Sequence, residues 1–176
     1  MRTSQALDRF KDAARRFHSS YHLANLGLSK LAGTDFSAEA TAGLTLHKLV
    51  DAEHGNVISE LPLSHLRAGM KRDGPISQVI AHGILSWIYA AWNDKARKEI
   101  AVELGVDENQ VLCDVMGDLR LLRNAIAHDF ATAGDKVANL RELSWFKPGR
   151  LVITSADMDK IQLAINGMTI RVRGQD

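Results

Sequence analysis

An apolar seam in the N-terminal segment constrains the fold more than any other feature of the sequence. Its side chains recur at alternating steps of three and four residues, and they are Leu7, Phe10, Ala14, Phe17, Tyr21, Ala24, Leu28 and Leu31. That spacing puts them on one face of an α-helix and is typical of a helical bundle or a coiled coil. Charged residues such as Arg9, Asp12 and Arg16 fill the other face. The sequence therefore predicts a long amphipathic helix that ends near Gly33 and packs against other helices.

Helical patterns continue along most of the chain. Pro75 stands where a long helix would begin and Gly105 where it would end, and Asp107 is placed to cap the next residues through Asn109 and Gln110. We expect a further helix at 37–53, closed by Gly55 and Asn56, and a last helix at 156–165, capped by Ser155. Pro62 and Gly69 interrupt the segment between them, where Ser64 could cap a short helix. Gly117 could break or join two helical pieces.

Two short segments near the C-terminus have a strand pattern instead. A turn at Pro148 and Gly149 leads into 151–154, and MTIRVRG at 168–174 alternates apolar and basic side chains. These two segments could pair as a short C-terminal β-ribbon. Taken together, the patterns predict an all-α protein, a compact bundle of about five to seven helices that forms a single domain over residues 1–176.

The composition of the chain excludes several classes of protein. Its 176 residues suffice for one domain with a substantial core, and a net charge of +1 gives no broad basic field of the kind that DNA-coating proteins carry. Cys113 is the only cysteine, so no intrachain disulfide forms, which fits a reducing compartment. Residues 1–17 are charged throughout, unlike a signal peptide, and no apolar run approaches the ~20 residues of a membrane span. We therefore expect a cytoplasmic protein that does not associate with membranes.

The stretch RLLRNAIAHDF, residues 120–130, carries the most informative polar side chains. A helical wheel puts Val115, Leu119, Leu122 and Ile126 on the inward face. Arg123 lies on the flank of that face, Arg120 lies about a quarter turn away, and Asn124 and His128 lie near the opposite side, beside Leu121, Ala125 and Ala127. Polar groups among small and apolar ones are typical of a surface that faces a partner. The alternative is that the polar groups are solvated and that His128 interacts with the helix dipole.

The segment RNAIAH, residues 123–128, resembles the signature of the HEPN superfamily, the higher eukaryotes and prokaryotes nucleotide-binding proteins. That signature is an arginine, usually followed by a polar residue, and then a histidine after four to six intervening residues. Here Asn124 follows Arg123, and four residues intervene before His128. The longer stretches WNDKARKEIAVELGVDENQVLCDVMGDLRLLRNAIAH and WFKPGRLVITSADMDKIQLAI also resemble bacterial HEPN-like proteins. The resemblance covers roughly residues 87–165, whereas the first 75 residues share only a helical pattern with the family.

This resemblance implies a helical bundle that forms a homodimer. Many family members are metal-independent ribonucleases in toxin–antitoxin, abortive-infection or CRISPR-linked defence, and two motif helices build one composite active site. By analogy, His128 would be the acid or base, Arg123 would clamp the scissile phosphate, and Asn124 would orient one of them or bind a phosphate oxygen. Arg120 is not part of the signature, but it could add a phosphate contact.

The reaction that the resemblance implies is endonucleolytic cleavage of RNA to a 2′,3′-cyclic phosphate, without a metal or other cofactor. An antitoxin or a nucleotidyltransferase could act as a partner. Two other functions stay open: a non-catalytic HEPN module that binds nucleotide or nucleic acid, and a helical dimerisation or interaction domain. ATP hydrolysis and dinucleotide binding are unsupported, because the sequence lacks G-x-x-x-x-G-K-[ST] and G-x-G-x-x-G.

Other candidate residues carry a weaker signal. His18 and His22 are four residues apart, so both could face one metal ion, but no carboxylate or further histidine stands at a supporting spacing. We expect structural or surface roles for this pair. Packing or surface roles are also expected for His47, His54, His65, His82, Cys113, Trp87, Trp92, Lys136, Arg141, Lys147, Arg150, Arg171 and Arg173.

Overall fold

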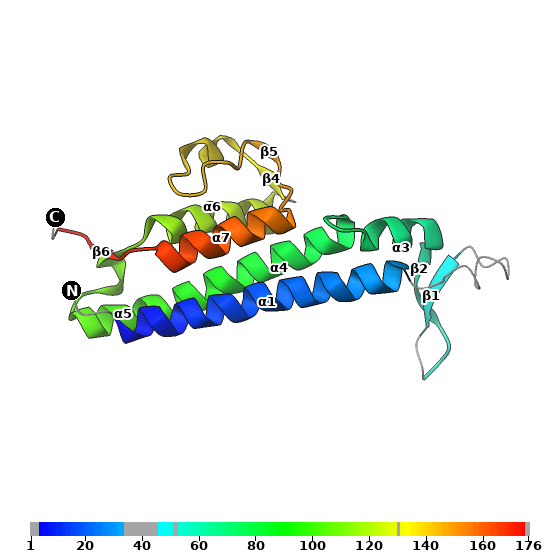
Figure 1. Ribbon diagram of the computed structural model, residues 1–176, viewed down its shortest axis with the longest axis horizontal. Helices are drawn as coiled ribbons and strands as arrows, with labels where there is room; N and C mark the ends of the chain where they lie inside the picture. Colours follow the sequence, from blue (N-terminus) through cyan, green and yellow to red (C-terminus); the bar gives the residue numbers. More distant parts are fainter. Residues whose placement is uncertain (1–3, 34–45, 51–52, 130, 175–176) are drawn as a thin grey trace.

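Two antiparallel columns of helix form the longest part of the molecule (Figure 1). The structure is a computed structural model that describes residues 4–33, 46–50, 53–129 and 131–174. One column is α1 (Gln5–Gly33), and the other runs through α4 (Pro75–Ala91), the π-helical turn η1 (Trp92–Ala96) and α5 (Arg97–Leu104). The predicted long helices are confirmed. Pro75 begins α4, and Gly105 ends α5 in a left-handed conformation with φ of +68°.

The predicted seam of α1 is buried over its N-terminal part. Phe10, Ala14 and Tyr21 are buried against the second column and α7 (Ser155–Gly167), whereas Leu31 is exposed near the end of the helix. The C-terminal part of α1 contacts α3 (Leu63–Met70), at the end of the molecule that lies away from α5 (Figure 1).

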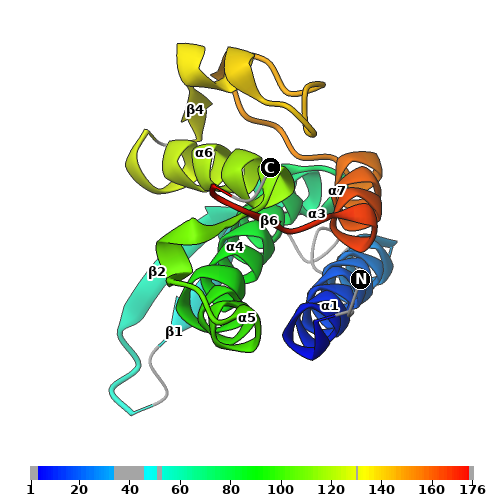
Figure 2. The same cartoon turned by 90° about the vertical axis from the view of Figure 1, so that its left-hand side faces the viewer.

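A second pair of helices lies on these columns (Figures 1 and 2). α6 (Asp114–His128) packs on α4, and α7 (Ser155–Gly167) packs on α1. Apolar side chains from all of these helices join one buried core cluster, which includes Leu85, Ile88, Leu119, Leu122, Ile161 and Ile165. The all-α bundle predicted from the sequence is confirmed. Gly117 does not interrupt α6, which is a single helix.

The predicted helix at 37–53 is wrong where the structure describes it. Residues 46–50 form the strand β1 (Leu46–Val50), which pairs antiparallel with β2 (Val57–Pro62); 37–45 and 51–52 lie outside the described residues. Gly55, with φ of +69°, and Asn56 are turn residues, and here they lie between two strands instead of closing a helix. Pro62 then precedes α3 (Leu63–Met70), so Ser64 lies inside that helix and does not cap it.

The predicted helix caps are partly confirmed. The Asp107 carboxylate accepts a hydrogen bond from the Asn109 backbone N–H and caps the 3₁₀ turn η2 (Glu108–Gln110). At α7 the cap is Thr154 rather than Ser155, because Thr154 and Asp157 form the reciprocal capping box. Ser155 instead donates its backbone N–H to the Asp73 carboxylate over 2.8 Å.

The short C-terminal strand exists, but its predicted partner is wrong. β6 (Arg171–Val172) pairs with β3 (Val111–Leu112), and β5 (Gly149–Arg150) pairs with β4 (Thr132–Ala133). The segment 151–154 joins neither pair. Side chains of α4 bond part of its backbone: Ile153 exchanges hydrogen bonds of 2.8 and 3.0 Å with the Gln78 amide, and His82 donates to the Leu151 carbonyl. The Leu151 N–H donates to the Ala131 carbonyl over 2.7 Å.

The segment between α6 and α7, which includes the 3₁₀ turn η3 (Asp135–Asn139), lies over α6 (Figure 1). A buried carboxylate fixes it there. Oδ2 of Asp118 accepts backbone N–H bonds from Arg141, Glu142 and Leu143, over 2.7 to 2.9 Å. Asp118 thus serves the fold, even though it lies on the helix that carries the motif. None of the described helices combines the length and the apolarity that a membrane crossing requires.

Candidate functional site

One side of α6 stays uncovered in this chain. The exposed residues Gly117, Arg120, Asn124, Ala127 and His128 recur at three- and four-residue steps and therefore share one helix face, which we call the open α6 face. The opposite side packs inward as the wheel predicts, with Val115, Leu119 and Leu122 buried and Ile126 half-buried. Ala125 differs from the prediction because it is buried in the core.

A groove between α4 and α6 borders the open α6 face. It encloses about 490 Å³ and is lined by Ser86, Trp87, Tyr89, Ala90, Asn93, Asp94, Arg120, Arg123 and Asn124. Three of the four predicted site residues therefore share one groove. Its charged side chains are two guanidinium groups and one carboxylate, that of Asp94, so the lining favours an anionic ligand by a small margin.

The π-helical turn η1 shapes the α4 side of this groove. Trp92 and Ala96 point into the core, where the Trp92 ring packs edge-on against Phe10 with centroids 5.4 Å apart. Asn93 and Asp94 of the same turn line the groove, and the Asn93 amide donates to the Asp94 carboxylate over 3.1 Å. π-Turns are rare and often accompany functional sites, and no pattern in the sequence predicted this one.

Trp87 provides an aromatic surface at the groove. Its side chain is 59% exposed, so it is only partly a core residue, and its ring lies 6.3 Å from that of Phe17. An exposed indole beside two guanidinium groups can stack on a nucleobase while the cations contact phosphate. The packing role predicted for the two tryptophans thus holds fully for Trp92 and only in part for Trp87.

The guanidinium groups of Arg120 and Arg123 are available to a ligand. Arg123 donates from Nη1 to the Asn124 side-chain oxygen over 3.3 Å, which orders both side chains at the groove. Among the described residues, neither Arg120 nor Arg123 forms an ion pair with a carboxylate. A guanidinium that no protein carboxylate neutralises can hold two phosphate oxygens.

His128 lies apart from these residues within one chain. It is exposed in the last turn of α6, it does not line the groove, and no hydrogen bond within the described residues holds its ring. It is aligned with Asn124 and Gly117 along the open α6 face. The chain therefore gathers Arg120, Arg123 and Asn124 in the groove but leaves His128 outside it, exposed on the open α6 face.

Two other titratable groups are poor candidates for chemistry. Burial raises the pKa of the Cys113 thiol, against a weaker opposing effect of hydrogen bonds from the Met116 and Val115 backbone, so little reactive thiolate forms at neutral pH. Burial also lowers the pKa of His82, whose ring bonds the Leu151 carbonyl. Both residues have the packing roles that the sequence predicted.

The sequence prediction missed one polar group, the carboxylate of Asp159 on α7. Its Oδ1 lies beside the rings of His18 and His22 on α1, although nearly the whole chain separates it from them. No carboxylate stands at a supporting spacing in the sequence, but the fold brings one to this histidine pair from a distant helix. No local signal could have revealed the cluster, because it depends on how α7 packs on α1.

Three comparisons with known proteins found no matching family model, no matching curated protein and no matching solved structure.

Proposed function

We propose that the protein is a metal-independent endoribonuclease of the HEPN type, with an active site completed by the α6 helices of two copies. One observation carries the proposal: the uncovered side of α6 presents the motif histidine and borders a groove that holds the motif arginine, which forms no ion pair among the described residues. In a two-fold dimer through the open α6 face, each copy would contribute the same residues. Gly117 and Ala127 on that face are small, which permits close approach of the two helices.

The chemistry follows from the side chains. RNA cleavage without a metal requires a base for the 2′-hydroxyl proton, a cation for the phosphate and an acid for the leaving 5′-oxygen. His128 supplies acid or base near neutral pH, and the His128 residues of the two copies can divide the two tasks. Arg123 holds the phosphate, Asn124 orients its guanidinium, and Arg120 contacts a neighbouring phosphate. A single-stranded substrate fits the groove, where Trp87 can stack on a base.

The biological setting belongs to the same proposal. A dimeric ribonuclease with an open active site needs control, so we place the protein in defence or in a toxin–antitoxin pair. An antitoxin or a nucleotidyltransferase would restrain it by covering or modifying the open α6 face.

The test is cleavage of single-stranded RNA by the purified protein in the presence of EDTA. The wild type should cut, leave 2′,3′-cyclic phosphate ends, and elute as a dimer. His128→Ala should abolish cutting and keep the dimer, whereas His65→Ala, at an exposed histidine of α3, should change neither. Undiminished cutting by His128→Ala would refute the mechanism. Binding of RNA without cutting by the wild type would replace it with the non-catalytic module, and a monomer without RNA affinity would leave a plain interaction domain.

A further inference from the structure

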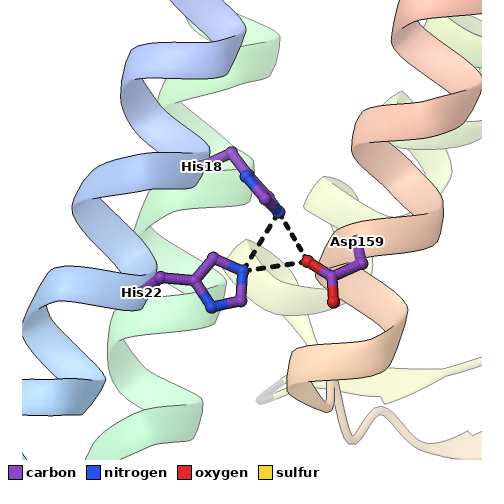
Figure 3. A group of neighbouring side chains, drawn as sticks. All are labelled: His18, His22 and Asp159. Carbon is purple, nitrogen blue, oxygen red and sulfur yellow. Dashed lines mark hydrogen bonds and ion pairs between the residues drawn. The ribbon is translucent and has the colours of Figure 1, made fainter.

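Two histidines of α1 and one carboxylate of α7 converge on a single point (Figure 3). His18 and His22 are one helical turn apart, so their rings lie on the same side of α1, and Asp159 faces them from the second turn of α7. The His18 Nε2 to Asp159 Oδ1 distance is 2.8 Å, the His22 Nε2 to Asp159 Oδ1 distance is 2.9 Å, and the two Nε2 atoms are 3.1 Å apart. Three potential ligand atoms thus form a closed triangle.

Protons cannot satisfy all three sides of this triangle. Each Nε2 atom carries at most one hydrogen, and an ionised carboxylate oxygen carries none. If both rings donate to Asp159, two N–H groups face each other across the His18–His22 side. If one ring donates to the other, the acceptor nitrogen turns its lone pair toward the carboxylate. One side therefore stays repulsive in every tautomer that leaves the carboxylate ionised.

A single cation satisfies all three sides at once, because every lone pair then points at it. Metal–ligand bonds of about 2.0–2.1 Å place neighbouring ligand atoms about 2.8–3.0 Å apart in octahedral geometry and about 3.3–3.4 Å apart in tetrahedral geometry. The observed separations of 2.8 to 3.1 Å lie at or within 0.1 Å of the octahedral range and are shorter than the tetrahedral one. A ligand set of two imidazoles and one carboxylate also binds first-row divalent transition metals in preference to Mg²⁺ or Ca²⁺.

We propose that His18, His22 and Asp159 form a binding site for a divalent transition metal of the zinc class. Their side chains are 22%, 40% and 55% exposed, so an ion can enter from solvent and keep water on its remaining positions. Within the described part of the chain, these residues are the one group of histidine, cysteine and acidic side chains with this convergence. The proposal departs from the expectation that the protein uses no metal, and it shares no residue with the ribonuclease site.

The position of the site defines what the metal does for the chain. It joins α1 to α7, two helices that are far apart in sequence, next to their buried contact through Tyr21 and Ser155, whose hydroxyls are 3.3 Å apart. The Tyr21 ring also packs edge-on against His22, with centroids 5.2 Å apart, and helps to hold that ligand in place. Because the unfolded chain cannot bring the three ligands together, metal binding stabilises the fold.

The test uses the full chain, stripped with EDTA, dialysed and titrated with Zn²⁺ in a calorimeter. The wild type should bind one ion and unfold at a higher temperature in its presence. Co²⁺ should bind at the same site and give visible d–d absorption from direct coordination. His22→Gln and Asp159→Asn should each weaken Zn²⁺ binding at least about tenfold and remove the Co²⁺ absorption, because each removes one ligand.

Two matched controls keep the result specific. His65→Gln makes the same change at an exposed histidine of α3, and Asp8→Asn makes it at an exposed carboxylate of α1; both should bind Zn²⁺ like the wild type. The metal-free ligand variants should unfold within a few degrees of the metal-free wild type, which separates a lost ligand from a damaged fold. The site is refuted if the wild type gains no thermal stability from Zn²⁺, or if the ligand variants bind as tightly as the controls.

Discussion

If the proposed dimer forms through the open α6 face, Gly117→Arg should stabilise the single chain and abolish that dimer. Gly117 lies within α6, and a Cβ atom built there would meet no other atom within 4 Å, so the new side chain has room in one copy. Glycine in a helix interior is about 0.5–1 kcal/mol less favourable than alanine, and arginine is nearly as good a helix former as alanine. The substitution should therefore stabilise the isolated fold by about 0.5–1 kcal/mol, or roughly 1–4 °C in a chain of this size.

The same side chain would obstruct a dimer built through the open α6 face. Two-fold symmetry would bring two new guanidinium groups to a contact between helices that Gly117 leaves open. Light scattering after size exclusion should show a monomer, and RNA cleavage should fall with the dimer. The added positive charge would, by itself, strengthen attraction to RNA, so lost cleavage would report lost assembly rather than lost binding.

Gly27→Arg is the matched control. Gly27 is also an exposed glycine within a helix, in α1, and a Cβ atom there would likewise meet nothing within 4 Å. It should gain similar stability and keep both the dimer and the cleavage activity. Denaturation of both variants at low protein concentration checks the stability term. A Gly117→Arg protein that remains a dimer and cuts RNA at the wild-type rate would show that this face of α6 is not the interface.

Two further predictions concern the scaffold around the site. Asp118→Ala should lower the free energy of unfolding, measured in urea, by about 3 kcal/mol or more, because three backbone N–H groups lose their charged acceptor. Asp118→Asn should lower it clearly less, since all three donors bond one oxygen that an amide oxygen can replace. Equal losses in the two variants would contradict this geometry. Burial holds the pKa of His82 in the folded chain below its ordinary 6.5, so below that pH the unfolded chain binds more protons than the folded one. The stability of the fold should therefore decrease as the pH drops from about 6.5 through the pKa of His82 in the folded chain. His82→Asn should reduce that loss, and an unchanged pH dependence would show that His82 does not contribute to it.

The sequence predicted those parts of the fold that depend on neighbours in the chain. The Pro75 start, the Gly105 end and the Asp107 cap each rest on a pattern within a few residues, and each is confirmed; the α1 seam rests on such a pattern too and is confirmed over its N-terminal part. The outward direction of Asn124 and Arg120 on α6 follows in the same way from helical periodicity.

The failures occur where distant residues decide the outcome. The segment 151–154 has a strand pattern, but Gln78 and His82 of α4 bond the Ile153 backbone and the Leu151 carbonyl, and no pattern near 151 signals that competition. Ala125 is small enough to suit either side of α6, so the way α6 packs in the core, rather than its sequence, decides that it is buried. The groove beside Arg123 needs Asp94 from a π-helical turn, and the histidine pair needs Asp159 from α7. Candidate sites that combine several helices depend on tertiary packing, which the periodicity of a single helix does not predict.

The two proposals can be separated by one chelator experiment, because they assign metal to the fold and none to the reaction. The triad lies between α1 and α7, whereas the motif residues lie on α6 and its groove with α4. EDTA added to the Zn²⁺-loaded protein should lower the unfolding temperature to that of Asp159→Asn, yet leave the initial rate of RNA cleavage unchanged at a temperature where both forms are folded. If cleavage stops while the chain stays folded and dimeric, the metal takes part in the reaction, and His128 and Arg123 do not suffice. If neither property responds, the triad holds no metal that matters to the fold, and the ribonuclease proposal stands without it.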